Sequence, residues 1–451
     1  MNALNATHDP ARRSWLESAN LPASDFPLQN LPFGIVLHQG RRRGGVAIGD
    51  QIIDLGAALV LDLFSGDVAA AATAASGPVL NPLMAMGNSQ TSALRSRLAD
   101  LMDGGQCRTA DRERVARCLV PQAEVAMQLP CEIGDYTDFL TSAAHTERHG
   151  RLKGLQPSLP PTFKHLPVAY HGRSSSIRVS GTPVRRPNGQ WLDDARIPRF
   201  GPVESLDFEL EMAAFIGPGN ELGQPIALSA ASNHIFGYCL LNDWSAKGVQ
   251  WWEQVLGPFL GKSFLTSISP WVVTSEALLP FSRASGAHQP DDPQPLAYLA
   301  ESRGASAGSF SIRLSATIRT AIMRAAGNAG TCVSRTSLDH MYWSFRQMVT
   351  HHASNGCNLR PGDLLGSGTL SGEEATSMGC MTEMTSAGRN PVTLGSGEKR
   401  LWLHDGDEVI LNATAEREGF VSIGFGRCGG EIIPSIPWPE QGATPPALTS
   451  S

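Results

Sequence analysis

Residues 206–215 read LDFELEMAAF, a stretch in which acidic and apolar side chains alternate. Asp207, Glu209 and Glu211 occupy every second position, with apolar residues between them. Because a strand turns successive side chains to opposite faces, the pattern predicts one apolar face and one face of three carboxylates. Two interpretations are open on spacing alone. The acidic face of a half-buried strand meets water, or the carboxylates converge on a cation.

Working outward from this strand, the rest of the chain also favours β-structure. Residues 25–60 contain short strand patterns, and further strands are predicted at 234–241, 309–318 and 401–411, whereas residues 61–120 have helical composition. The sequence contains 46 Gly and 31 Pro, which favours many turns. Because strands and helices do not alternate regularly, we expect a mainly β, α+β architecture. A domain boundary is placed near Pro121 and Pro130, which bracket a change in composition.

One long helix is predicted after a loop over residues 283–308. An apolar stripe at helical spacing runs from Leu338 to His352. Thr336 or Ser337 would cap its start, and Gly356 would end it. Because this stripe already includes His352, the adjacent His351 and His352 are interpreted as structural or as neighbours of ligating residues, not as metal ligands.

Composition excludes several functional classes. A formal net charge of -6 gives no electrostatic basis for binding nucleic acid or an anionic membrane surface. No signal peptide and no membrane-spanning segment is recognised, and the eight cysteines include no CxxC pair. Reduced thiols and a cytoplasmic location are therefore expected. GPFLGKS (257–263) resembles a phosphate-binding loop but has the wrong glycine spacing, so it predicts no nucleotide site.

Four acidic positions are candidate metal ligands. Glu209 and Glu211 share a strand face, and Asp243 closes the strand pattern HIFGYCLLND. Asp138 is seven residues before His145, so the two would share one face if that segment is helical. Oxygen ligands of this kind favour Mg²⁺ or Ca²⁺ over zinc.

Lys247, Gln250 and Lys262 could supply hydrogen-bond donors near such a cluster. A surface position is the ordinary expectation for a lysine. Next to a bound metal, however, these side chains would stabilise a developing oxyanion. The residues alone thus indicate a metal-assisted hydrolase or lyase with a histidine base.

Many motifs in the chain resemble one enzyme family. DYTDF, HLPVAYHGRSSSI, VSGTPVRRPNGQ, LDFELEMA, IFGYCLLNDWSA, LGPFLGKSF, HMYW, THHASNGCNLRPGDLLGSGTLSG and DGDEVI occur in the order typical of the fumarylacetoacetases. The resemblance runs from about residue 26 to residue 434. It implies a small N-terminal SH3-like barrel (1–125), a larger catalytic domain with a rolled sheet (126–435) and a tail expected to be disordered (436–451).

The resemblance also implies an activity and its residues. Members of the family hydrolyse a carbon–carbon bond of a 1,3-diketo acid, releasing fumarate and acetoacetate, and form homodimers. The residues that match their Mg²⁺ or Ca²⁺ site are Asp138, Glu209, Glu211, Asp243, Lys262 and Thr266. A water-activating pair matches His145 and Glu383, and the oxyanion contacts match Lys262, Lys247 and Gln250. Asp207 is then expected to be structural.

The chain departs from the family pattern at its substrate contacts. Leu140 stands where a tyrosine is common, Lys247 replaces an arginine, and Lys153 aligns with a carboxylate-binding arginine across a one-residue gap. Tyr170 and Thr369, which match two other substrate contacts, are retained. Lysine supplies charge without the bidentate fork of arginine. Alternatives are therefore the same reaction on another 1,3-diketone or acylpyruvate, and a non-catalytic metal-stabilised dimer.

Overall fold

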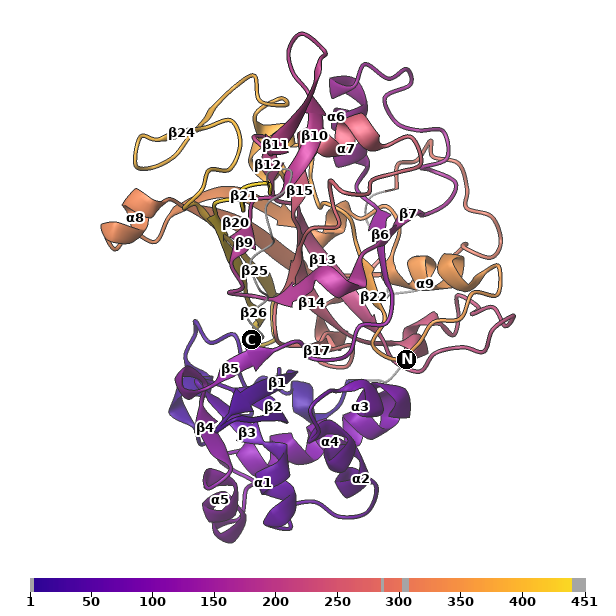
Figure 1. Ribbon diagram of the computed structural model, residues 1–451. Helices are drawn as coiled ribbons and strands as arrows, with labels where there is room; N and C mark the ends of the chain where they lie inside the picture. The colour runs from indigo at the N-terminus through magenta and orange to yellow at the C-terminus, as the bar shows by residue number, and fades with distance from the viewer. Residues whose placement is uncertain (1–3, 285–287, 302–307, 440–451) are drawn as a thin grey trace.

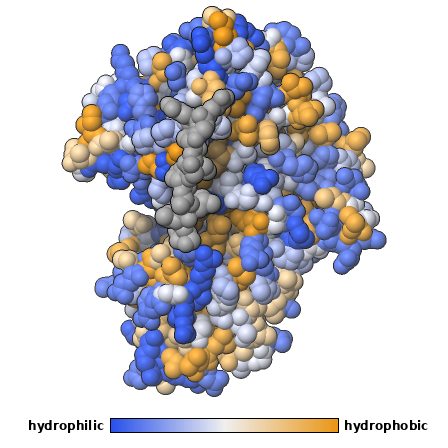
Figure 2. Space-filling view, in the orientation of Figure 1, coloured by the Kyte–Doolittle hydropathy of each residue, from blue (hydrophilic) through white to orange (hydrophobic). Residues whose placement is uncertain are grey.

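The fold comes from a computed structural model, which describes residues 4–284, 288–301 and 308–439. A small unit, residues 33–128, lies below a large unit, residues 136–433, in Figure 1. On the face shown in Figure 2, hydrophilic residues are spread over both units and hydrophobic residues gather in small groups. Among the described residues, no helix is both long and apolar enough to cross a membrane.

The small unit combines one antiparallel sheet with five helices. Its strands follow the order β4-β3-β2-β1-β5 and are β1 Phe33–His38, β2 Arg41–Ile48, β3 Gln51–Asp54, β4 Leu119–Pro121 and β5 Ala126–Gln128. Its helices are α1 Leu55–Val60, α2 Gly66–Ala75, α3 Asn81–Met86, α4 Asn88–Met102 and α5 Thr109–Ala116. Strands followed by helices match what the sequence predicts for residues 25–120.

Two sheets form the large unit. The first has the order β7-β6-β22-β13-β14-β16-β8 with β17 added on β14. Its strands are β6 Tyr136–Leu140, β7 Val168–Gly172, β8 Ile177–Val179, β13 Leu210–Ile216, β14 Ile235–Asp243, β16 Thr266–Ile268, β17 Val273–Thr274 and β22 Leu364–Gly366. The second has the order β21-β20-β25-β26-β9, with β9 Val184–Arg185, β20 Ile312–Arg319, β21 Thr331–Ser337, β25 Glu408–Ala415 and β26 Ile423–Ile433. The mainly β, α+β class predicted from the sequence is confirmed.

Short strand pairs and helices surround these sheets. The paired short strands are β10 Asn188–Leu192 with β11 Pro198–Pro202, β12 Leu206–Asp207 with β15 Ser245–Ala246, β18 Ser282–Arg283 with β19 Ser309–Phe310, and β23 Val392–Thr393 with β24 Lys399–Arg400. The helices are α6 Ala143–Leu152, α7 Lys247–Glu253, α8 Ala321–Ala325, α9 Phe345–Ala353 and α10 Met381–Met384. Helices α6 and α7 lie next to each other at the top of Figure 1.

The stretch LDFELEMAAF does not form a half-buried strand. It is divided into β12 and β13, and every residue of both strands is buried. Met212 and Ala214 belong to the core of the large unit, whereas Ala213 and Phe215 pack into the core shared with the small unit. The half-buried interpretation is wrong because β13 is a central strand covered on both faces.

The predicted helix over residues 338–352 is also wrong in its start. Strand β21 continues to Ser337, a single 3-10 turn follows, and α9 begins only at Phe345. Ser344 caps it through a reciprocal pair: its Oγ accepts from Gln347 N, and Gln347 Oε1 accepts from Ser344 N at 2.9 Å. The apolar residues of the stripe are present. However, pairing of β21 with β20 keeps the chain extended as far as Ser337, directly before the stripe begins.

The structure bears on three other expectations. The strand predicted at 401–411 begins at Glu408, because residues 401–407 form a loop in which Asp407 accepts from Arg400 and from His404 N. Residues 285–287 and 302–307 of the loop predicted at 283–308 lie outside the described residues. So does most of the predicted tail, residues 440–451.

Candidate active site and metal centre

Four carboxylates converge on one part of the first sheet of the large unit. Asp138 lies on β6, Glu211 on β13 and Asp243 at the end of β14, while Glu209 precedes β13. One oxygen from each lies within 4.8 Å of the others, and all four residues are buried. The alternation in residues 206–215 therefore places Glu209 and Glu211 together, as the cation interpretation requires.

Asp138 reaches this cluster from a strand. A helix that carries Asp138 and His145 on one face, as their spacing allows, does not form. Asp138 pairs with Gly366 in the parallel ladder of β6 with β22, and α6 begins only at Ala143. Helix propensity is overridden here because Tyr136 and Phe139 are buried in the sheet.

Asp207 is separate from the cluster. Its carboxylate accepts hydrogen bonds from Met381 N at 2.7 Å and Thr382 N at 2.8 Å, at the start of α10. This helix carries Glu383, so Asp207 holds the helix that positions another candidate residue. The sequence gives no sign of these partners.

The charges around the cluster leave room for one divalent cation. Lys247 Nζ lies 2.5 Å from Glu209 Oε1, and Lys262 Nζ lies 2.5 Å from Glu209 Oε2 and 2.6 Å from Asp243 Oδ2. Four carboxylates beside two ammonium groups give a net charge of -2 when all are ionised, which one divalent ion would neutralise. Thr266 Oγ1 donates to Asp243 Oδ1 at 3.2 Å. An ammonium group has no lone pair to give to a metal ion, so Lys262 is not itself a ligand. Its ion pairs instead hold the carboxylates of Glu209 and Asp243 in place.

The ionised forms of Asp138 and Glu211, the two carboxylates without a lysine partner among the described residues, are electrostatically disfavoured. Burial, followed by repulsion from Asp243, raises the pKa of Asp138 well above its ordinary value. Burial, followed by repulsion from Asp138, does the same to the pKa of Glu211. Glu211 Oε1 is buried without a hydrogen-bond partner among the described residues. An all-oxygen donor set with an unpartnered oxygen fits a hard cation such as Mg²⁺ or Ca²⁺.

A glycine turn brings backbone against the same carboxylates. Gly368 N donates to Asp138 Oδ1 at 3.2 Å and to Glu211 Oε2 at 3.1 Å. A Cβ at Gly366 would lie 2.5 Å from Asp138 Oδ1. The glycines of the stretch GSGTLSG (366–372) therefore let the backbone pass close to the carboxylates, where a side chain would not fit.

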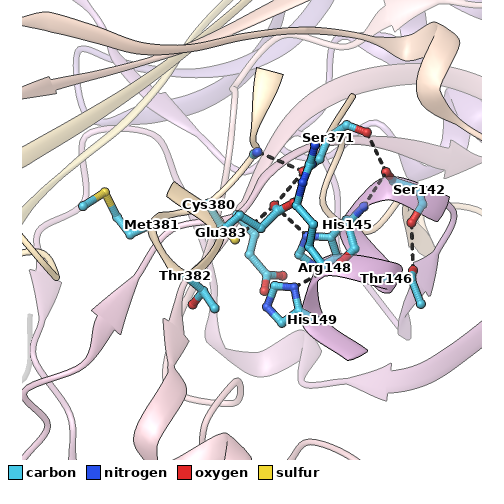
Figure 3. Close-up of polar contacts among 12 residues, drawn as sticks. Ser142, His145, Thr146, Arg148, His149, Ser371, Cys380, Met381, Thr382 and Glu383 are labelled. Atoms are coloured by element: carbon cyan, nitrogen blue, oxygen red, sulfur yellow. Dashed lines mark hydrogen bonds and ion pairs between the residues drawn. The ribbon is translucent and has the colours of Figure 1, made fainter. Parts of the chain in front are cut away.

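A histidine–glutamate pair lies beside the carboxylate cluster. His145 Nδ1 is 2.8 Å from Glu383 Oε2, with His145 on α6 and Glu383 on α10 (Figure 3). Ser371 Oγ donates to the same Glu383 oxygen at 2.7 Å, and Arg148 Nη1 lies 3.1 Å from the other. Burial opposes ionisation of Glu383, but its interaction with His145 holds its pKa below the ordinary value. The carboxylate thus fixes the proton on His145 Nδ1 and leaves Nε2 able to accept one.

One cavity joins the pair to the carboxylates. Its volume is about 350 Å³, and it is lined by His145, Asp138, Glu209 and Lys262 among others. The six predicted substrate contacts all line it: Leu140, Lys153, Tyr170, Lys247, Gln250 and Thr369. Tyr170 donates its hydroxyl to Asp243 Oδ2 at 2.7 Å. The remaining predicted residues, Glu211, Asp243, Thr266 and Glu383, lie behind this wall.

Lys153 is an unusual cation in this cavity. It follows α6, and its Nζ lies 5.8 Å from the ring centroid of Trp251. Among the described residues, no carboxylate lies within 4 Å of Lys153. Burial, together with repulsion from Lys247, lowers the pKa of Lys153 to about 8. Lys153 keeps part of its surface exposed to solvent, and an ammonium at the cavity wall without an anionic partner is suited to receive an anion from a bound molecule.

Sequence reasoning missed three residues around the pair. Arg148, which contacts Glu383, and His149 lie on the same helix as His145, and Cys380 precedes α10. The spacing of His149 four residues after His145 is a signal that could have found it, since such residues share a helix face. No sequence signal places Cys380, which arrives from a distant segment.

The chain is similar to known proteins along most of its length. Residues 29–130 match a family profile described as "Fumarylacetoacetase N-terminal", and residues 136–432 match one described as "Fumarylacetoacetate (FAA) hydrolase C-terminal". The chain belongs to the fumarylacetoacetate hydrolase family. Fumarylacetoacetases from Bos taurus and Homo sapiens are 47% and 45% identical to it, each match covering 92% of this chain and 97% of the relative. The Arabidopsis thaliana fumarylacetoacetase is 43% identical over 422 residues, 92% of this chain and 97% of the relative.

A solved structure supports the family fold. The fumarylacetoacetate hydrolase from psychrophilic Exiguobacterium antarcticum aligns with a TM-score of 0.50 and 16% identity, covering 90% of this chain and 99% of that one. Metal dependence is a property of the fumarylacetoacetate hydrolase family, and the carboxylate cluster supplies a fitting site for the ion.

Proposed function

We propose that this protein hydrolyses fumarylacetoacetate to fumarate and acetoacetate, the last step of tyrosine and phenylalanine breakdown. The observation that carries the proposal is the shared cavity: His145 of the histidine–glutamate pair lines the same space as Asp138 and Glu209 of the four-carboxylate cluster. The relatives that cover nearly the whole chain are named fumarylacetoacetases, a class of carbon–carbon hydrolase, which supports the same conclusion.

His145 is the proposed general base. Its Nε2 takes a proton from water as the water oxygen attacks the carbonyl carbon, and Glu383 stabilises the resulting imidazolium through Nδ1. The carbon–carbon bond then breaks, and its electron pair leaves with the acetoacetate fragment. The proton on His145 Nε2 is available to the carbon that receives this pair.

The remaining residues bind and orient. Held by Asp138, Glu209, Glu211 and Asp243, an Mg²⁺ or Ca²⁺ ion would supply Lewis acidity toward the diketone oxygens. Lys247, Gln250 and Lys262 line the cavity and would donate hydrogen bonds to the alkoxide formed by attack.

Lys153 is the proposed partner of a terminal carboxylate of the substrate. Fumarylacetoacetate has a carboxylate at each end, and Lys153 lies at the wall of the cavity without an anionic partner among the described residues. Leu140 lines the same cavity and offers no donor. A lysine binds a carboxylate without the fork of an arginine, and Leu140 adds apolar surface. This combination favours the second candidate, hydrolysis of another 1,3-diketone or acylpyruvate with a more apolar end.

Assembly and location complete the proposal. We propose a homodimer in the cytoplasm, with an N-terminal domain over residues 1–125 and a catalytic domain over 126–435. All eight cysteines are free, which suits a reducing compartment. Light scattering on the purified protein measures the assembly state, and a monomer at micromolar concentration would contradict the dimer.

Turnover of a panel of diketo acids tests the function. We expect fumarylacetoacetate to be hydrolysed fastest when Mg²⁺ or Ca²⁺ is present, and activity to disappear after chelation. Faster hydrolysis of an acylpyruvate would favour the second candidate. Absence of turnover for every member, in protein that binds the ion, would support a non-catalytic dimer.

A further inference from the structure

A second group of metal-binding side chains lies beside the histidine–glutamate pair. One ligand atom from each of His145, His149 and Cys380 lies within 4.8 Å of the others. Figure 3 shows the three residues gathered around Glu383. The carboxylate cluster offers only oxygen, whereas this group offers two imidazole nitrogens and a sulfur. Its donor chemistry is therefore that of a softer ion.

Both imidazoles are held in the form that binds a metal through Nε2. His145 Nδ1 lies 2.8 Å from Glu383 Oε2, and His149 Nδ1 lies 3.2 Å from the backbone oxygen of His145. Each oxygen accepts, so each Nδ1 carries the proton and each Nε2 keeps its lone pair. Such a hydrogen bond from the second ring nitrogen to an oxygen is the usual arrangement behind a metal-binding histidine.

One ring nitrogen of His149 is available as a metal ligand. Its Nε2 is buried and lacks a hydrogen-bond partner among the described residues. Its ring centroid is 4.1 Å from that of His145, so the two side chains present neighbouring edges. Burial lowers the pKa of His149 well below its ordinary value, which keeps the ring neutral. Cys380 Sγ donates a hydrogen bond to Glu383 Oε2 at 3.3 Å, and a bound ion would take the place of this proton.

We propose that His145, His149 and Cys380 form a second metal site that takes Zn²⁺ or a similar borderline-soft divalent ion. On binding, the thiol proton of Cys380 leaves to solvent and the sulfur bonds to the ion as a thiolate. Neither partner is oxidised or reduced. Tetrahedral zinc places its donors about 3.5 Å apart, and one ligand atom of each residue already lies within 4.8 Å of the others, so side-chain rotation must bring the two Nε2 atoms and Sγ together. The fourth position is left for water.

Zinc bound here inhibits the proposed hydrolysis. The ion occupies the Nε2 lone pair of His145, the atom that would otherwise take the proton from water. This consequence rests on the proposed function, but binding itself does not. The two can therefore fail separately.

Calorimetry with Zn²⁺ on protein saturated with Mg²⁺ tests the site. We expect one zinc per chain, with proton release measured by repeating the titration in buffers of different ionisation enthalpy. Cys380→Ser and His149→Ala should each weaken zinc binding at least ~10-fold. Cys131→Ser, which changes a buried thiol outside the group, should leave it unchanged.

Co²⁺ in place of Zn²⁺ reports the sulfur directly. Thiolate-to-cobalt charge-transfer absorption is expected in the wild type and in Cys131→Ser, and its loss is expected in Cys380→Ser. If the absorption is absent from the wild type, or if zinc affinity is the same in all variants, the ion occupies only the carboxylate cluster and the site does not exist. If zinc binds as expected while turnover persists, the site stands and the assignment of His145 as base is wrong.

Discussion

Glu211 is the carboxylate whose surroundings point most directly to a cation. Its Oε1 is buried without a partner among the described residues, and no lysine forms an ion pair with it there, whereas Glu209 and Asp243 are paired with lysines. A neutral amide at this position keeps the shape of the side chain and removes one charge from the donor set.

Glu211→Gln should weaken Mg²⁺ or Ca²⁺ binding at least ~10-fold while the protein stays folded. The reason is that hard-ion affinity depends on the number of charged oxygen ligands. Calorimetry measures the affinity, and circular dichroism checks the fold. Unchanged affinity would remove Glu211 from the metal site.

His145 and Glu383 should act as one unit. His145→Gln is expected to lower kcat by at least ~10²-fold, because a positioned general base contributes that much. Glu383→Gln should also lower kcat, and the double variant should be little slower than His145→Gln alone, since each change disables the same proton transfer. Steady-state kinetics on the three variants checks this, with ion affinity as the control. Multiplicative losses would show that the two residues act independently.

Lys153 should give substrate recognition an alkaline limit. Its pKa is lowered to about 8, so it is charged at neutral pH and loses the charge as pH rises through about 8. We expect kcat/KM for fumarylacetoacetate to fall above that pH, by ~10-fold or more, as a charge-assisted contact with the carboxylate is lost. A diketone without a terminal carboxylate should not show this fall.

Substitutions at the same wall separate charge from shape. Lys153→Arg should move the alkaline limit upward, because arginine stays protonated. Combined with Leu140→Tyr, it should sharpen preference for the dicarboxylate by roughly ten- to a hundred-fold. The opposite outcome is a wild-type protein that is already fully selective and a double variant that loses activity on fumarylacetoacetate. That outcome would show that other contacts recognise the carboxylate.

At the scale of elements, the turn after β22 controls how closely the backbone approaches the carboxylate cluster. Gly368 has a φ of 72°, in the left-handed region, and a Cβ there would lie 2.1 Å from Phe139 O. Gly397 has a similar φ of 84°, but a Cβ there would meet nothing within 4 Å. The two glycines therefore share a backbone conformation and differ in crowding.

Gly368→Ala should cost at least ~2 kcal/mol more unfolding free energy than Gly397→Ala. Both changes carry the left-handed penalty of about 1–2 kcal/mol, and only the first adds a steric clash. Urea unfolding measures the difference. Gly368→Ala should also weaken ion binding, because its N–H holds Asp138 and Glu211. Equal losses in the two variants would mean that the turn relaxes freely.

At the scale of the whole molecule, the two units share a hydrophobic core. Ile35 and Val46 of the small unit and Phe215, Leu241 and Ile268 of the large unit belong to one buried cluster. Backbone hydrogen bonds also join the units: Phe33 N donates to Val272 O at 3.1 Å, and Val272 N donates to Phe33 O at 2.8 Å. The division near residue 125 stays a prediction about domains, but the units depend on each other for burial.

Removing residues 1–125 should therefore make the remainder insoluble or aggregated. The cut exposes the apolar face of β13 and β14 that the small unit covers. Sedimentation of the fragment 126–435 checks this, and the whole chain should unfold in urea in one transition by both fluorescence and circular dichroism. A soluble, monodisperse fragment that binds Mg²⁺ as the whole chain does would contradict it.

The sequence by itself identified the four carboxylates that the structure brings together. The alternation at residues 206–215, the acid at the end of HIFGYCLLND and the family motifs named every carboxylate of the cluster, because ligand type and strand periodicity are local properties. The mainly β class followed for the same reason, from local composition and turn residues.

Only the tertiary structure decided where each group lies. Asp138 lies on a strand although its spacing from His145 suits a helix, and the helix predicted from residue 338 starts at Phe345, since sheet pairing across the chain overrides local propensity. The partners of Glu383, the burial that lowers the pKa of Lys153, and the approach of Cys380 to His149 join segments far apart in sequence. Such contacts depend on how the two sheets and their helices pack, and no spacing along the chain encodes them.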